Sequence, residues 1–147
     1  MDEHLVLERD FDAPPQALWR AFTDPRSLAG WFGPEGWSVA EESVRVEARP
    51  GGEWHLEMAS DDDPAQRSPV TARLGEVEEP RLLVGHTEAT EESGGRAMVL
   101  RVAFAELDGG RTRLTLTQGP YAAELLPMAG EGWTSSFAKL DRRLAAG

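Results

Sequence analysis

Cysteine is missing from this sequence, which excludes disulfides, thiolate nucleophiles and cysteine-based zinc sites. Positive charge is scarce as well, because 15 Lys and Arg residues stand against 26 Asp and Glu residues and give a formal net charge of −11. Nucleic-acid backbones and anionic membranes repel such a chain, so we expect no nucleic-acid partner. Apolar runs of 18 residues are also lacking, and we expect no membrane insertion.

The N-terminal residues 1–4 lack both the basic and the apolar part of a secretion signal. Together with the lack of cysteine, this favours a cytoplasmic protein. The chain has 147 residues, of which 40% are hydrophobic, and this suits one domain over residues 1–147 with a sizeable core.

The first quarter of the chain predicts one strand and two short helices. Residues 4–11 read as a strand, and the prolines at 14 and 15 suit the first turn of a helix over residues 14–23. Asp24 is the expected N-cap of a second helix over residues 25–32, which Gly33 and Pro34 would stop.

From residue 37 onward the hydrophobic period falls to two, which indicates antiparallel strands joined by short turns. Because a one-residue slip would send a strand's apolar residues to the wrong face, each turn length predicts a register. A three-residue turn at residues 50–52 predicts the pairs Ala48 with Trp54, Val46 with Leu56 and Val44 with Met58.

Two further hairpins follow from the same argument. A turn at residues 108–110 predicts Phe104 opposite Leu114 and Val102 opposite Leu116. A turn at residues 78–80 predicts Leu74 opposite Val84 and Ala72 opposite His86, which places Glu76 and His86 on the apolar face and Val77 and Leu83 on the outer face.

The C-terminal segment returns to a helical period and carries the apolar stripe Trp133, Phe137, Leu140 and Leu144. This helix begins either near Pro127 or after the glycines at 130 and 132. It is the element large enough to cover the apolar face of the sheet, so the fold class is α+β, with a curved antiparallel sheet of about seven strands wrapped on the long C-terminal helix.

Four stretches carry a resemblance to a known family: "FDAPPQALWRAFTDPRSLAGWFGP", "EARPGGEWHLEM", "GEVEEPRLLVGHT" and "GEGWTSSFAKLDRRL". In this order they resemble the bacterial family named for its similarity to the activator of the ninety-kilodalton heat-shock protein's ATPase. That family belongs to the START-related SRPBCC superfamily of helix-grip proteins. The resemblance covers residues 5–144 and implies a fold with a cavity between sheet and helix, whose ligand it leaves open.

Candidate ligand-binding residues are those that the predicted faces and the two short helices direct towards this gap. Each of them has core packing as its alternative role. The set is Trp31, Trp37, Trp54, Leu56, Met58, Leu74, Val84, His86, Met98, Leu100, Val102, Leu116, Gln118, Tyr121, Trp133 and Phe137.

His86 and Glu76 are the candidate acid/base pair, because the predicted register places them on neighbouring strands. The alternative is that water or backbone satisfies each of them at the strand end. No catalytic residue is otherwise assigned. The three histidines lack metal-ligand spacing and no glycine-rich phosphate motif precedes a helix, so we expect neither metal nor cofactor.

Three functions follow from these observations. The first is binding of a small apolar or amphipathic molecule in an internal cavity, without established catalysis. The second is an enzyme resembling the superfamily's cyclases and aromatases, which would use His86 and Glu76. The third is a protein-binding module similar to the chaperone activator. The sequence leaves the oligomeric state open, a homodimer included.

Overall fold

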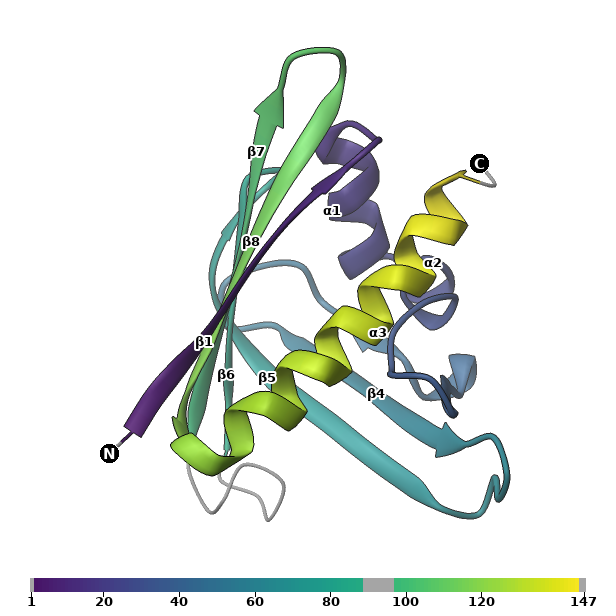
Figure 1. The fold of residues 1–147 in the computed structure, drawn as a ribbon. Helices are drawn as coiled ribbons and strands as arrows, with labels where there is room; N and C mark the ends of the chain where they lie inside the picture. Colours follow the sequence, from purple (N-terminus) through teal and green to yellow (C-terminus); the bar gives the residue numbers. More distant parts are fainter. Residues whose placement is uncertain (1, 89–96, 146–147) are drawn as a thin grey trace.

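A computed structural model describes residues 2–88 and 97–145 of the chain (Figure 1). Two short 3-10 turns accompany the regular elements, at Glu41–Ser43 and Ala123–Leu125. The helices and strands, in chain order, are β1 (Asp2–Phe11), α1 (Pro15–Thr23), α2 (Pro25–Ala29), β2 (Trp37–Val39), β3 (Arg45–Val46), β4 (Glu53–Ser60), β5 (Arg67–Glu78), β6 (Leu82–Thr87), β7 (Met98–Leu107), β8 (Arg111–Ala122) and α3 (Leu126–Ala145).

The strands form one antiparallel sheet in the order β1-β8-β7-β6-β5-β4-β2, and the two-residue β3 also pairs with β4. The sheet curves, and α3 runs across its concave side while α1 and α2 lie towards the far end of that helix (Figure 1). This confirms the predicted α+β architecture of a curved sheet around a long C-terminal helix.

The two short helices begin as the sequence predicts. Pro15 occupies the first turn of α1, and Asp24 caps α2 by accepting a hydrogen bond from the Ser27 backbone N–H at 2.9 Å. This bond lowers the pKa of the Asp24 carboxyl. α2 ends at Ala29, three residues before the predicted end, and Gly30 follows where a Cβ would collide with the Arg143 guanidinium. The early end of α2 frees the next two aromatic residues to enter the core.

The hairpin of β7 and β8 has the predicted register, with Phe104 opposite Leu114 and Val102 opposite Leu116. The predicted register of residues 44–58 is wrong by two residues, because Val46 rather than Ala48 lies opposite Trp54. The reason lies in the turn. The Gly51 N–H donates to the Leu74 carbonyl at 2.7 Å and the Leu74 N–H donates to the Gly52 carbonyl at 2.8 Å, so these glycines extend the pairing with β5.

The predicted register of β5 and β6 is wrong by one residue. Leu74 lies opposite Gly85, and a β-bulge separates this pair from the pair of Val77 with Leu83. One extra residue in β5 reverses the predicted faces of β6. Leu83 therefore faces the core and is buried, whereas Val84 lies opposite Arg101 and outside the core cluster.

α3 begins at Leu126 and continues through both of its glycines without a break. Phe137 and Leu140 are its most deeply buried side chains, and the Phe137 ring meets Phe11 of β1 edge to face at 5.7 Å. Arg9 of β1 pairs with Asp141 at 2.7 Å beside this contact. The C-terminal half of α3 is therefore packed onto the sheet at β1.

Candidate functional site

Aromatic side chains from the segment after α1 fill one end of the space between sheet and helix. The Trp31 ring lies 4.9 Å from Phe22 and stacks on Phe137 of α3 at 6.2 Å. Phe32 meets Trp54 of β4 at 5.4 Å and Trp133 of α3 at 5.5 Å, both edge to face. These residues join the sheet to the helix, and the space beyond them is open.

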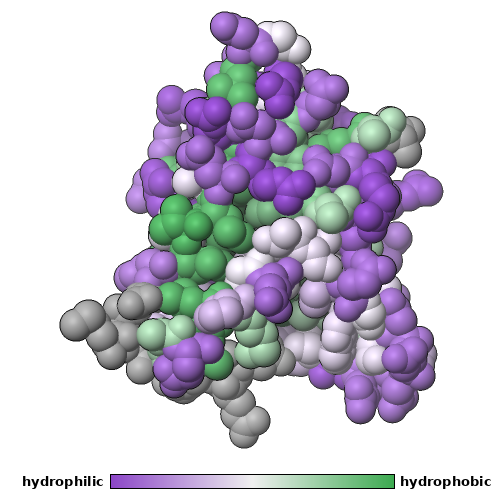
Figure 2. Space-filling model, in the orientation of Figure 1, coloured by the Kyte–Doolittle hydropathy of each residue, from purple (hydrophilic) through white to green (hydrophobic). Residues whose placement is uncertain are grey.

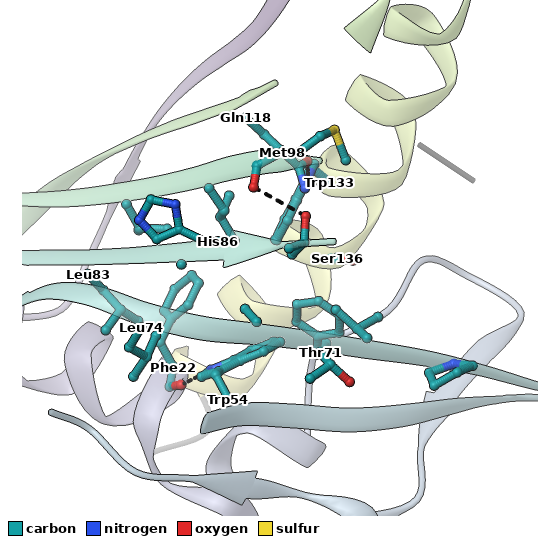
Figure 3. Close-up of a pocket in the computed structure, with 18 of the residues that line it drawn as sticks. Phe22, Trp54, Thr71, Leu74, Leu83, His86, Met98, Gln118, Trp133 and Ser136 are labelled. Atoms are coloured by element: carbon teal, nitrogen blue, oxygen red, sulfur yellow. Dashed lines mark hydrogen bonds between the residues drawn. The ribbon is translucent and has the colours of Figure 1, made fainter. Parts of the chain in front are cut away.

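That space is a cavity of about 660 Å³. Its walls come from the inner face of β4 to β8, from the N-terminal half of α3 and from the segment around Phe32 (Figure 3). Cavities of about 300–1,000 Å³ with mostly apolar walls are typical of small-molecule sites. Exposed residues among the lining, such as Arg73 and Glu88, show that the cavity reaches the surface.

The structure divides the sixteen candidate residues into two groups. Ten line the cavity, namely Trp54, Met58, Leu74, His86, Met98, Leu100, Val102, Gln118, Tyr121 and Trp133. The six that do not are Trp31, Trp37, Leu56, Val84, Leu116 and Phe137.

The members of the second group have different surroundings. Trp31, Leu56, Leu116 and Phe137 are at most 1% exposed and belong to the core cluster. Trp37 is half-buried on the short edge strand β2, where its carbonyl accepts a hydrogen bond from Lys139 at 2.8 Å. The β-bulge places Val84 on the outer face of β6, opposite Arg101, where it is still buried.

Sequence reasoning missed several residues of the cavity wall, above all on α3. Small residues at positions i, i+3 and i+7, which are Ala129, Gly132 and Ser136, line the cavity beside Trp133. This spacing on one helix face was a usable signal, since it marks a stripe where a helix leaves room against its neighbour. The glycines suggested a helix break instead. The other missed residues include Phe22, Val70, Ala72, Leu83, Gly85 and Thr87.

Gln118 is the polar centre of the cavity. Its side-chain oxygen Oε1 accepts a hydrogen bond from the Tyr121 hydroxyl at 2.7 Å and another from the Trp133 indole N–H at 2.8 Å. All three residues line the cavity, with Gln118 and Tyr121 on β8 and Trp133 on α3. Figure 3 shows Gln118 and Trp133 close together. The amide is therefore held by both the sheet and the helix.

Burial raises the pKa of Tyr121 to about 12. Tyr121 is the single tyrosine of the chain, so tyrosinate absorbance reports on it alone. We expect the folded protein to show little tyrosinate at pH 11, whereas the chain unfolded in guanidinium titrates near the ordinary value of about 10. Since the raised pKa favours the protonated folded state, this contribution to stability is present below about pH 10 and is lost as the pH rises through 12. Full ionisation of the folded protein at pH 10 would contradict this placement of Tyr121.

The predicted pair of His86 and Glu76 is not formed. His86 lies opposite Arg73 and Val99, which are both exposed, and its own side chain is exposed. Its imidazole lies against Gly75, where a Cβ would come within 2.9 Å of Nε2. Glu76 is exposed within the bulge. The one-residue shift that the bulge introduces is the reason that His86 borders the cavity without directing its side chain into it.

Within residues 2–88 and 97–145, no group of three or more His, Cys, Asp or Glu side chains could hold a metal ion. The helices described in the structure are all too short or too polar to cross a membrane.

A family model, described as "Activator of Hsp90 ATPase homolog 1-like protein", matches residues 12–145. The chain belongs to this family. The match confirms the resemblance found in the sequence, together with the helix-grip fold of the SRPBCC superfamily that it implied. The sequences of curated proteins gave no significant match.

Solved structures of family members and similar proteins share this fold. The AHSA1 protein from Silicibacter pomeroyi is 28% identical, with a TM-score of 0.80 over 98% of this chain and 99% of that one. A protein from Mycobacterium smegmatis is 26% identical, with a TM-score of 0.77 over 98% and 91% of the two chains. A protein from Nitrosomonas europaea is 24% identical, with a TM-score of 0.81 over 97% and 94%. None of these descriptions names a ligand, so the cavity itself has to indicate one.

Proposed function

We propose that this chain binds one small apolar or amphipathic molecule in the cavity between the sheet and α3. The observation that carries the proposal is a cavity of about 660 Å³ whose lining is mostly apolar and includes the fixed amide group of Gln118. Pockets of this size with apolar walls and few polar groups are the usual sites of small organic ligands.

The distribution of charge supports the same function. Among the lining residues that the structure describes, the Asp, Glu, Lys and Arg side chains are Glu53, Arg73 and Glu88, and all of them are exposed. The apolar part of a ligand would thus move from water into the interior of the cavity, while a polar part would remain at the charged opening. Burial of apolar ligand surface supplies the binding energy in such an arrangement.

The neutral dye Nile red provides a direct test, because its emission rises when it leaves water for an apolar environment. We expect a saturable rise with one dye bound per chain and a dissociation constant in the micromolar range, measured by fluorescence titration. A competing apolar molecule should reverse the rise. A weak response that grows linearly with dye concentration would contradict the proposal, because it would indicate adsorption to the surface.

The protein-binding alternative requires a contiguous exposed apolar surface. Among the described residues, the large hydrophobic side chains that are exposed are Val6, Val99 and Met128. Val6 and Val99 lie on the convex face, whereas Met128 lies on α3. Figure 2 shows a mostly hydrophilic face with hydrophobic residues gathered towards one side. Exposed apolar residues on separate elements are ordinary in soluble proteins, and we propose no protein partner.

A further inference from the structure

We propose that the cavity selects a neutral carbonyl compound, whose oxygen accepts a hydrogen bond from the side-chain nitrogen Nε2 of Gln118. This inference rests on the proposed function, since it specifies the chemistry of the molecule bound at the same site. It makes Gln118 the residue that determines specificity, within a mostly apolar wall.

The orientation of the Gln118 amide is fixed by its neighbours. The indole N–H of Trp133 can only donate a hydrogen bond, and it lies 2.8 Å from Oε1. An inverted amide would place two donors against each other. The Tyr121 hydroxyl donates to the same oxygen at 2.7 Å, so both oxygen lone pairs are occupied.

The two N–H groups of the amide nitrogen Nε2 take no part in the hydrogen bonds with Trp133 and Tyr121. No residue that the structure describes accepts a hydrogen bond from Nε2, and no buried side-chain polar atom among them lacks a partner. The nitrogen is therefore accessible, and Gln118 lines the cavity. A donor held in place beside an apolar cavity is matched by a ligand acceptor such as a carbonyl oxygen.

The surroundings of Gln118 favour a neutral acceptor over an anionic one. Arg73 is the only Lys or Arg among the lining residues within 2–88 and 97–145, and it is exposed on β5 rather than beside Gln118 on β8. The burial that raises the pKa of Tyr121 also disfavours an unpaired charge on a ligand at this position. A carboxylate would lose its large free energy of hydration there and gain a hydrogen bond from one neutral donor. A ketone, ester or amide carbonyl gains the same hydrogen bond and loses far less hydration free energy.

Aromatic rings flank the site. Trp133, which fixes the Gln118 amide, contacts Phe32 at 5.5 Å, and Phe32 in turn contacts Trp54 at 5.4 Å. These three residues all line the cavity and present wide apolar surfaces. Flat aromatic molecules that carry a carbonyl group are thus suitable probes.

The rigid molecules 9-fluorenone and fluorene form a matched pair for the test, because their ring systems agree and fluorenone adds the carbonyl oxygen. Calorimetric titration of the wild-type chain should show both molecules bound, with fluorenone about tenfold tighter. In the NMR spectrum of the ¹⁵N-labelled protein, the Gln118 side-chain NH₂ signals should move downfield with fluorenone and far less with fluorene.

The variant Gln118→Glu tests the role of the amide nitrogen. It keeps an oxygen that accepts from Trp133 and Tyr121, but it replaces the donor with an acceptor. At pH 9 Tyr121 is still protonated, since its pKa is about 12, and the ionised carboxylate of the variant should abolish or reverse the preference for fluorenone. Fluorene affinity should change less than fluorenone affinity. Should this variant not fold, the wild-type affinities and the Gln118 NMR signals decide the question.

The possible outcomes separate this inference from the proposed function. Binding of fluorene and fluorenone with equal affinity, or a preference that survives Gln118→Glu at pH 9, would overturn the role of Gln118 and leave the cavity as a binding site. Absence of saturable binding for fluorene, fluorenone and Nile red alike would overturn both. A preference in the wild type that disappears in the variant supports the inference.

Discussion

Replacement of Trp31 by Ala should lower the free energy of unfolding by about 3–5 kcal/mol. The side chain is 1% exposed and packs against Phe22, Phe32 and Phe137. Its indole N–H also donates to the Ala21 carbonyl at 2.9 Å, and the substitution leaves that buried acceptor without its partner. Urea unfolding followed by circular dichroism measures the loss.

The matched control is Trp37→Ala, which removes a side chain of the same kind from the edge strand β2. Trp37 is half-buried and its carbonyl, which binds Lys139, remains in the variant. We expect a loss of about 1 kcal/mol or less for this substitution. Equal losses for the two tryptophans would contradict the assignment of Trp31 to the core between sheet and helix.

Replacement of Gly132 by Trp should weaken Nile red binding by more than about tenfold while the protein stays folded. Gly132 lines the cavity on α3, and a Cβ at this position meets no atom within 4 Å. A large side chain there can thus enter the cavity without displacing the helix. The same fluorescence titration that tests the wild type measures the effect.

Gly132→Ala is the control for this substitution, because it changes the helix but occupies little of the cavity. Since Gly lowers helix stability relative to Ala, the Ala variant should be more stable than the wild type by up to about 1 kcal/mol and should bind the dye with similar affinity. If the Trp variant bound Nile red as well as the Ala variant does, the dye would lie elsewhere.

Local signals in the sequence were sufficient to predict the main helices and strands and the register of one hairpin. Pro15 and Asp24 start the two short helices because their chemistry acts within one turn, independently of distant residues. The turn at residues 108–110 also determines its own register, since Gly109 and Gly110 supply the positive φ angles that the three-residue turn requires.

Long-range contacts determine the strand registers that the local sequence pattern could not predict. Gly51 and Gly52 belong to the predicted three-residue turn, but their backbone groups form hydrogen bonds with Leu74 of β5, a strand that comes later in the chain. The bulge in β5 adds one unpaired residue without changing the alternation that the sequence displays, and it moves His86 and Val84 to the convex side. Such features depend on the partner strand, and the periodicity of a single strand carries no information about its partner.

The cavity shows the same division between local and distant information. Six of the ten candidate residues that line it follow from strict alternation on the inner faces of β4, β7 and β8, namely Trp54, Met58, Met98, Leu100, Val102 and Gln118. Alternation identifies an inward face, however, and does not distinguish residues in solid packing, such as Leu56 and Leu116, from those beside open space. That distinction depends on the small residues of α3 opposite the sheet.

The crystal structure of the wild-type chain grown with 9-fluorenone tests the central claim most directly. We expect electron density for one fluorenone molecule between the sheet and the N-terminal half of α3, in contact with Leu100 and Trp133. Side chains that fill this space completely, with fluorenone bound elsewhere or not at all, would contradict the account.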